Sequence, residues 1–189
     1  MFKEFLNQDI EITRKLLSLE TQIKKVISLI YLTIKKNNKV FICGNGGSAA
    51  DAQHLAAEFL VRLRPTIDRR PLPLISLMQD SSTFSACSND YDFKYIFSRN
   101  LEAMANKNDM LICLSTSGNS KNIIEVLKYA KKRKIKSISF LGKKGGKCKG
   151  ISDLEILIPS DITAKIQECH MMLGHFILEK VEDRLLNEK

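Results

Sequence analysis

The sequence predicts an α/β protein in which helices cover both faces of a doubly wound, five-stranded parallel sheet and an extra helix precedes the first strand. Two observations predict this fold. After the first helical segment, strand-like and helical segments alternate along the chain, which is the order that builds a parallel sheet. The strand-like runs are apolar without clean alternation, as expected where both faces of a strand are buried. The 189 residues suffice for one domain with its own core.

The elements can be assigned in chain order from the spacing of the apolar side chains. Residues 2–36 show helical spacing and are expected to be helical, with no strand to pair with them. Strands are predicted over residues 39–43, 73–77, 110–114, 136–141 and 154–158. Helices are predicted over residues 48–63, 81–88, 93–105, 120–134 and about 162–186. Ligands of such folds bind beyond the carboxyl ends of the strands, so chemistry is expected just after Cys43, Leu77 and Leu114.

The formal net charge of +9 comes from one region of the chain. Residues 131–149 contain nine lysines and arginines and no acid, and the rest of the sequence has equal numbers of bases and acids. A surface built for nucleic acid would more often interleave bases with exposed aromatic side chains. We therefore expect a solvated basic surface and no nucleic-acid partner; the alternative is that this surface binds nucleic acid or another acidic partner.

The sequence also predicts a cytoplasmic protein without a membrane partner. Its longest apolar stretch is too short to span a bilayer, and its N-terminus carries acids where a secretory signal would have an uninterrupted apolar core. The five cysteines are odd in number and form no C-x-x-C pair. Buried, reduced thiols are therefore favoured over a disulfide framework or a cysteine-based zinc site.

Residues 44–49 (GNGGSA), the glycine loop, follow the first predicted strand. Glycines let the backbone approach an anion closely, and the start of the next helix offers free N–H donors. The loop also fits the G-x-G-x-x-A pattern of dinucleotide-binding proteins. Against that interpretation, no acid closes the second predicted strand before Asp80. A plain structural turn is the remaining alternative.

Residues 115–120 (STSGNS), the serine loop, follow the third predicted strand and lead into a helix. Four hydroxyls at a strand-to-helix turn can donate to phosphate oxygens, and the helix dipole favours a dianion. The loop has no Walker lysine, so a phosphate monoester is favoured over a nucleoside triphosphate. The alternative is an N-cap cluster, although an N-cap needs only one hydroxyl.

Four polar side chains on two predicted helices are candidate metal ligands. His54 and Glu58 are four residues apart and share a helix face, and Gln167 and His175 lie two turns apart on the closing helix. Nitrogen and oxygen ligands of this kind suit zinc. By spacing alone, a surface pair and a satisfied core histidine are more common explanations.

These motifs together resemble the phosphoheptose isomerase family of the sugar-isomerase (SIS) domain superfamily. The resemblance rests on residues 44–54 (GNGGSAADAQH), Glu58, the serine loop, residues 166–168 (IQE) and His175, and it extends over nearly the whole chain, including residues 141–146 (LGKKGG). The two loops alone would indicate only an SIS domain. His54, Glu58, Gln167 and His175 are the specific signal for the isomerase.

The resemblance implies a single SIS domain over residues 1–189, with a flavodoxin-like sheet, that forms a homotetramer with active sites at subunit interfaces. Residues 1–36 would then be an oligomerisation region. It also implies one zinc per subunit, held by His54, Glu58, Gln167 and His175. The implied phosphate contacts are Ser48, Ser115, Thr116, Ser117 and Ser120. The other implied substrate contacts are Asn45, Gly46, Gly47, Asn89, Asp90 and Gln167. One departure is that Ala164 and Lys165 stand where some members have an acid–arginine pair.

The implied reaction is the isomerisation of sedoheptulose 7-phosphate to D-glycero-D-manno-heptose 7-phosphate, which feeds bacterial heptose synthesis for lipopolysaccharide or capsule. A ketose–aldose isomerase needs a base beside the carbonyl and an acid for the oxygen. Glu58 is the candidate base and His175 the candidate acid. Two alternatives are a non-enzymatic SIS adaptor of the replication-initiator-associating type, which would not need the metal positions, and a dinucleotide-dependent oxidoreductase.

Overall fold

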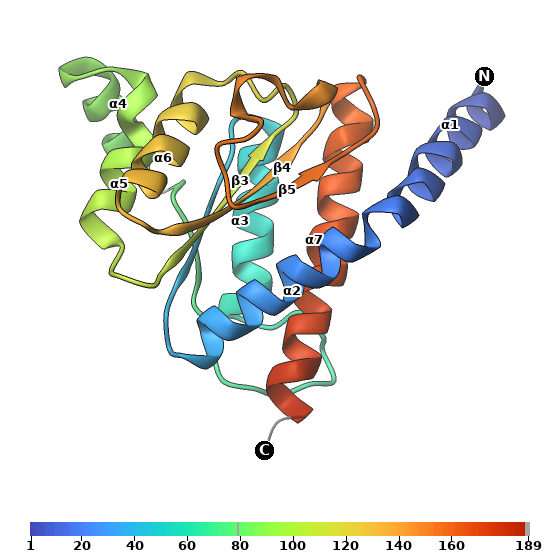
Figure 1. The fold of residues 1–189 in the computed structure, drawn as a ribbon, viewed down its shortest axis with the longest axis horizontal. Helices are drawn as coiled ribbons and strands as arrows, with labels where there is room; N and C mark the ends of the chain where they lie inside the picture. The colour runs from blue at the N-terminus through green and yellow to red at the C-terminus, as the bar shows by residue number, and fades with distance from the viewer. Residues whose placement is uncertain (79, 188–189) are drawn as a thin grey trace.

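The computed structural model describes residues 1–78 and 80–187 and confirms the predicted doubly wound fold (Figure 1). Its five strands form one parallel sheet in the order β2-β1-β3-β4-β5. The strands are β1 Val40–Cys43, β2 Leu74–Ser76, β3 Met110–Ser115, β4 Lys136–Leu141 and β5 Leu154–Leu157. Each strand end lies within one residue of its predicted position, because the apolar runs coincide with strands that are buried on both faces.

The helices also follow the predicted order. They are α1 Phe2–Lys15, α2 Glu20–Lys35, α3 Gly47–Leu60, α4 Ser81–Asp90, α5 Ile96–Met104, α6 Lys121–Lys132 and α7 Thr163–Asn187. Short 3₁₀ turns cover Leu16–Leu19, Phe93–Tyr95 and Lys143–Cys148. The first of these turns divides the predicted helical region 2–36 into two helices, and the third lies between the fourth and fifth strands.

Alternate residues of each strand face two separate cores. Val40 and Ile42 of β1 pack with α2, α3 and α7 on one side of the sheet. Phe41 and Cys43 pack with α4, α5 and α6 on the other side. All five cysteines are buried and unpaired, as predicted. The protein is therefore a three-layer sandwich with the sheet in the middle.

The loops after β1 and β3 leave the sheet toward opposite faces. The glycine loop leads from β1 into α3, which packs beside α7, and the serine loop leads from β3 into α6, which packs beside α5. Since β1 and β3 are neighbours in the sheet, the two loops diverge from adjacent strand ends. This topological switch point is where open parallel sheets bind their ligands.

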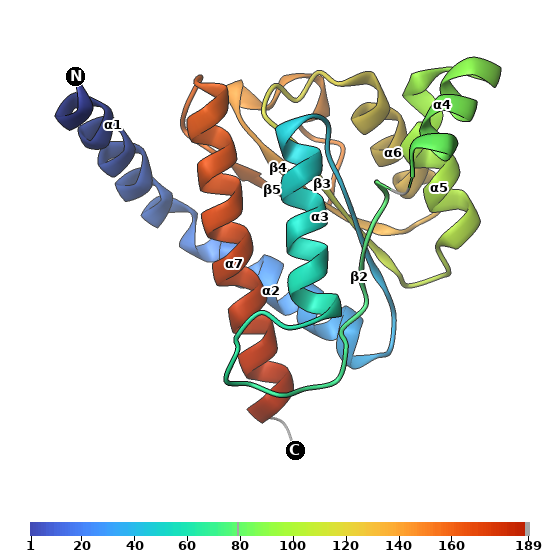
Figure 2. The ribbon, with the colours of Figure 1, turned by 180° about the vertical axis from the view of Figure 1, so that it is seen from behind.

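Helix α1 projects from the body of the domain (Figures 1 and 2). None of its residues, all of them described, is buried. Its attachment to α7 uses Lys165, whose ammonium group pairs with Asp9 and lies 3.9 Å from the centroid of the Phe5 ring. Among the described helices, none combines the length and the apolar character that a membrane span requires.

The basic region is a surface feature. All nine lysines and arginines between residues 131 and 149 are exposed, as the sequence predicts. Two of them, Lys131 and Lys132, occupy the last turn of α6, where positive charge suits the helix dipole.

Candidate active site

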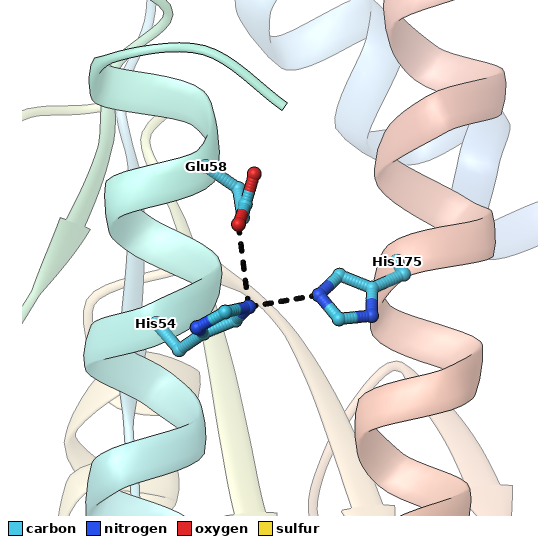
Figure 3. Close-up of side chains that lie close together, drawn as sticks. All are labelled: His54, Glu58 and His175. Atoms are coloured by element: carbon cyan, nitrogen blue, oxygen red, sulfur yellow. Dashed lines mark hydrogen bonds and ion pairs between the residues drawn. The ribbon is translucent and has the colours of Figure 1, made fainter. Parts of the chain in front are cut away.

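Three of the four predicted metal ligands meet between α3 and α7 (Figure 3). The Nε2 atom of His54 lies 2.9 Å from Nε2 of His175 and 3.3 Å from Oε1 of Glu58. One ligand atom from each of the three side chains can be chosen so that all lie within 4.8 Å of one another. We call these three side chains the trio.

Two features determine where the trio lies: the spacing of His54 and Glu58 on α3, and an ion network around the carboxylate of Glu182. His54 and Glu58 are one turn apart on α3 and therefore share a face. The carboxylate of Glu182 on α7 is fully buried and accepts hydrogen bonds from Arg64 at 2.6 Å and Arg69 at 2.5 Å. Arg69 also donates to the main-chain carbonyl of Glu58 at 2.9 Å. The network thereby fixes the end of α3 that carries Glu58 against α7.

The donor set of the trio fits a divalent metal ion. Two imidazole nitrogens and one carboxylate oxygen are common zinc ligands, with bond lengths of about 2.0–2.2 Å. Ligands of a tetrahedral ion at that distance are about 3.3 Å apart, and the observed separations of 2.9 Å and 3.3 Å are close to this value. His54 is 49% exposed and Glu58 21% exposed, so the trio is open to solvent within one chain.

Gln167, the fourth predicted ligand, lies against the start of α3. Its side-chain amide packs directly against Gly47 at the first residue of α3. Gly47 precedes His54 by seven residues, which is about 10 Å along a helix axis. Within this chain, the structure brings Gln167 to the start of α3, where the other predicted substrate contacts begin.

The glycine loop is tied to α6 by a side chain that the sequence analysis missed. Asn45 and Asn122 exchange two hydrogen bonds, each of 2.8 Å, and Asn122 is buried. Both the Nδ2 and the Oδ1 atoms of the Asn45 side-chain amide are therefore hydrogen-bonded to the start of α6. Ser48, the predicted phosphate contact on α3, is also buried. The only sequence signal for Asn122 is its place just after the serine loop.

The serine loop is held in shape by its own hydroxyls. Ser115 Oγ accepts a hydrogen bond from the Gly118 N–H at 3.1 Å, and Ser117 Oγ accepts one from the Asn119 N–H at 3.1 Å. A hydroxyl that accepts a bond can still donate its own proton. Ser120 is the N-cap residue of α6, but in the described structure its side chain makes no capping hydrogen bond. This arrangement favours the anion-binding interpretation over the N-cap alternative.

Two predicted substrate contacts are not brought to the trio within one chain. Asn89 and Asp90 are exposed at the end of α4, where Asn89 Nδ2 donates to Asp90 Oδ1 at 2.8 Å. Helix α4 lies on the flank of the domain opposite α7, as both overall views show (Figures 1 and 2).

Asp51 is a further polar residue near the trio that the sequence analysis did not single out. It precedes His54 by three residues on α3, so it stands one helical turn away. Burial raises the pKa of its carboxyl group, and the nearby His54 opposes that shift. Its Oδ2 atom is buried without a hydrogen-bond partner among the described residues. A carboxylate in this position is suited to orient a ligating histidine.

The comparisons with known proteins agree with this geometry. Residues 4–142 match the family model described as the SIS domain, which defines the class of the fold. The chain is 42% identical over 180 residues to the phosphoheptose isomerase of Helicobacter pylori strain P12, covering 95% of this chain and 93% of that protein. It is 45% identical over 168 residues to the phosphoheptose isomerase of Clostridium acetobutylicum, covering 89% and 85%. The chain belongs to the phosphoheptose isomerase family.

Solved structures of phosphoheptose isomerases are also similar to this chain. The phosphoheptose isomerase of Neisseria gonorrhoeae is 32% identical, with a TM-score of 0.87, over 96% of this chain and 97% of that one. The phosphoheptose isomerase of Francisella tularensis is 29% identical, with a TM-score of 0.88, over 96% of both chains. The similarity therefore includes α1 and α7 as well as the sheet.

Proposed function

We propose that the protein is an isomerase that converts sedoheptulose 7-phosphate to D-glycero-D-manno-heptose 7-phosphate, the first step of nucleotide-activated heptose synthesis in bacteria. The observation that carries this proposal is the meeting of His54, Glu58 and His175 at distances of 2.9 Å and 3.3 Å, in a chain 42% identical to a phosphoheptose isomerase. A non-enzymatic adaptor would have no use for such a trio.

The chemistry requires a proton to move between two neighbouring carbons. A base takes a proton from C1 of the ketose, the hydroxyl proton is redistributed between O1 and O2, and a proton is returned to C2. Glu58 is our proposed base, since its carboxylate lies on the His54 face of α3 and approaches His54 Nε2 to 3.3 Å. His175 is our proposed acid for the oxygens.

We further propose that the metal is zinc, one ion per subunit, held by His54, Glu58, Gln167 and His175. The two separations made by His54 are close to tetrahedral ligand spacing, which supports this choice, and the contribution of Gln167 rests on the family resemblance. A bound zinc ion would act as a Lewis acid on the carbonyl and hydroxyl oxygens of the sugar. The proton transfers themselves belong to side chains of the protein.

The phosphate of the substrate is assigned to the serine loop. We propose contacts from Ser48, Ser115, Thr116, Ser117 and Ser120. The Ser120 hydroxyl, which makes no capping hydrogen bond in the described structure, and the two loop hydroxyls that accept backbone N–H bonds support this assignment. The remaining proposed substrate contacts are Asn45, Gly46, Gly47, Asn89, Asp90 and Gln167.

The active unit is proposed to be a homotetramer of single-domain subunits, with residues 1–36 as an oligomerisation region. The exposed apolar side chains of α1, Phe2, Leu6 and Ile10, support this proposal. So does the exposure of Phe176, which follows His175 in the sequence. The distance of α4 from α7 within one chain suggests that Asn89 and Asp90 would serve a neighbour's site. The five unpaired thiols suit a reducing compartment, and we propose the cytoplasm.

Incubation of the pure, zinc-loaded protein with sedoheptulose 7-phosphate tests the proposed function. We expect the aldose D-glycero-D-manno-heptose 7-phosphate to accumulate, to cease forming after thorough chelation and to return when zinc is restored. Added nicotinamide cofactors should change nothing. An intact, metal-loaded protein that leaves the heptulose phosphate unchanged would contradict the proposal and favour a binding role.

A further inference from the structure

We propose that the segment Lys143–Cys148, which follows β4, is a positioning element that holds the serine loop in the conformation that binds the substrate's phosphate. This inference rests on the proposed function of the serine loop. The segment is not itself a predicted substrate contact. Its role is inferred from how it meets residues 117–119.

Two hydrogen bonds join the segment to the serine loop. The backbone N–H of Cys148 donates to the carbonyl oxygen of Gly118 at 2.9 Å. The backbone N–H of Lys147 donates to the side-chain Oδ1 of Asn119 at 3.1 Å. Both bonds fall on the part of the loop between Ser117 and Ser120, which are two of the proposed phosphate contacts.

The two backbones also approach too closely for any side chain between them. A Cβ atom on Gly118 would lie 1.9 Å from the carbonyl oxygen of Gly145. A Cβ atom on Gly146 would lie 2.5 Å from the carbonyl oxygen of Ser117 and 2.8 Å from the carbonyl carbon of Gly118. Glycine on both sides of this contact is therefore a packing requirement.

The segment adopts an unusual backbone conformation to make this contact. Four consecutive residues, Lys143 to Gly146, have positive φ angles of 48°, 65°, 90° and 52°. Two of them are lysines, for which this region is unfavourable. Such conformations persist where surrounding contacts hold them, and they gather near functional sites. Here the Lys143 N–H donates to the Ser160 carbonyl at 3.2 Å, which anchors the far end of the segment beyond β5.

The serine loop is therefore held in place by contacts with the positioning element as well as by its own hydrogen bonds. Its own hydrogen bonds, which Ser115 Oγ and Ser117 Oγ accept from backbone N–H groups, are local to the loop. The positioning element connects it to the framework of β4 and β5. Hydrogen-bond donors bind a phosphate well only if they are already arranged before the ligand arrives. We therefore expect disturbance of the segment to weaken phosphate binding while the chemistry at the trio continues.

The test compares two alanine substitutions at glycines of positive φ. Gly146→Ala places its Cβ against Ser117 and Gly118, whereas Gly150→Ala also adds a Cβ at a positive φ but with nothing within 4 Å of the added atom. We expect Gly146→Ala to raise KM for sedoheptulose 7-phosphate, and Kd for inorganic phosphate, by roughly ten-fold or more at a similar kcat. Gly150→Ala should match the wild type in KM, Kd and kcat.

A second variant, Asn119→Ala, tests the same role even if Gly146→Ala fails to fold. Asn119→Ala removes the acceptor for the Lys147 N–H without adding atoms, and Asn119 is exposed. We expect its KM and phosphate Kd to rise in the same direction at an unchanged melting temperature. If the wild type is active but both variants keep the KM and Kd of Gly150→Ala, the positioning role is wrong. An inactive wild type would instead contradict the proposed function, and the phosphate titration would still test the positioning element.

Discussion

The Nε2 atom of His54 stands between the two other members of the trio, 2.9 Å from His175 and 3.3 Å from Glu58. Two neutral imidazole nitrogens that face each other need one proton between them, because one must donate and the other accept. A divalent ion replaces that proton with a charge that all three ligands can share. His54 is therefore the side chain on which the proposed metal binding would most depend.

Substitution of His54 by alanine should remove this central ligand. We expect His54→Ala to lose most of its bound zinc and at least about 100-fold of its turnover, and to stay folded because His54 is half-exposed. Metal analysis, an activity assay and a thermal melt measure the three outcomes. Gln53→Ala, at the neighbouring exposed position on α3, is the control. Full activity of a metal-free preparation would contradict the metal site.

The buried side chain of His170 should make the free energy of unfolding depend on pH. His170 is buried on α7 with its ring 5.9 Å from that of Phe140, and burial lowers its pKa to about 4 against a smaller opposing effect of the Leu141 backbone. The unfolded chain binds this proton near pH 6.5, so the folded state loses stability as the pH falls from about 6.5 to about 4. The loss should be about 3 kcal/mol.

Urea unfolding of the wild type and His170→Phe at pH 7 and pH 4 measures this effect. The free energy of unfolding should fall less in the variant, by about 3 kcal/mol, because phenylalanine does not titrate. The comparison uses the change with pH in each protein, so a difference in packing cancels. An equal fall in both proteins would show that His170 is not the cause.

At this scale, the sequence predicted contacts within one helix better than contacts between helices. The four-residue spacing of His54 and Glu58 fixed their common face in advance. The place of Gln167 beside Gly47 depends on how α7 packs along α3, which no local spacing encodes. Asn122 was missed for the same reason, since its partner Asn45 is distant in sequence.

The elements that carry the site were predicted closely where burial dictates the pattern. Strands buried on both faces are continuous apolar runs, and all five were found within one residue at each end. The break at Leu16–Leu19 was not predicted, because α1 and α2 have similar apolar spacing and differ only in what covers them. The bulk of α2 packs on the domain, whereas α1 buries none of its residues, all of which are described.

At the scale of elements, removal of one hydroxyl from the serine loop should weaken binding of the substrate's phosphate. Each hydrogen bond to a charged group contributes roughly 1.5–3 kcal/mol. Ser120→Ala should therefore weaken affinity for the phosphorylated sugar by about ten-fold or more, at constant fold, since the Ser120 side chain makes no capping bond in the described structure. Titration with the substrate measures the change. If the wild type turned over an unphosphorylated heptulose equally well, the serine loop would not be the phosphate-binding site.

At the scale of the whole molecule, α1 is the feature that one chain leaves unexplained. Its apolar side chains Phe2, Leu6 and Ile10 recur every four residues and remain exposed. An amphipathic helix of this kind needs another surface to cover it. Assembly could be inferred from the sequence only through the family resemblance, because composition and spacing do not reveal what the helix packs against.

Charged substitutions on α1 test the proposed tetramer. The double variant Leu6→Asp and Ile10→Asp should lower the mass in solution from four times the subunit mass of 21.4 kDa to that of a smaller species. Activity should fall with it, because sites at subunit interfaces would be incomplete. Sedimentation analysis with an activity assay measures both. Asn7→Asp, an exposed polar position on the same helix, should stay tetrameric. A fully active monomer would contradict the proposed assembly.

The central claim is that this chain isomerises a phosphorylated heptose by proton transfer, with Glu58 as the base. Nuclear magnetic resonance of sedoheptulose 7-phosphate in deuterated water, with zinc-loaded wild type and zinc-loaded Glu58→Gln, tests it most directly. The wild type should form the aldose with deuterium at C2. Glu58→Gln keeps an oxygen ligand but loses the base, so its turnover should fall by on the order of 10²–10⁴ and its exchange should cease. If the zinc-loaded variant still exchanged hydrogen at a near-normal rate, Glu58 would be a metal ligand and not the base. If the wild type formed no aldose, the proposed reaction itself would be contradicted.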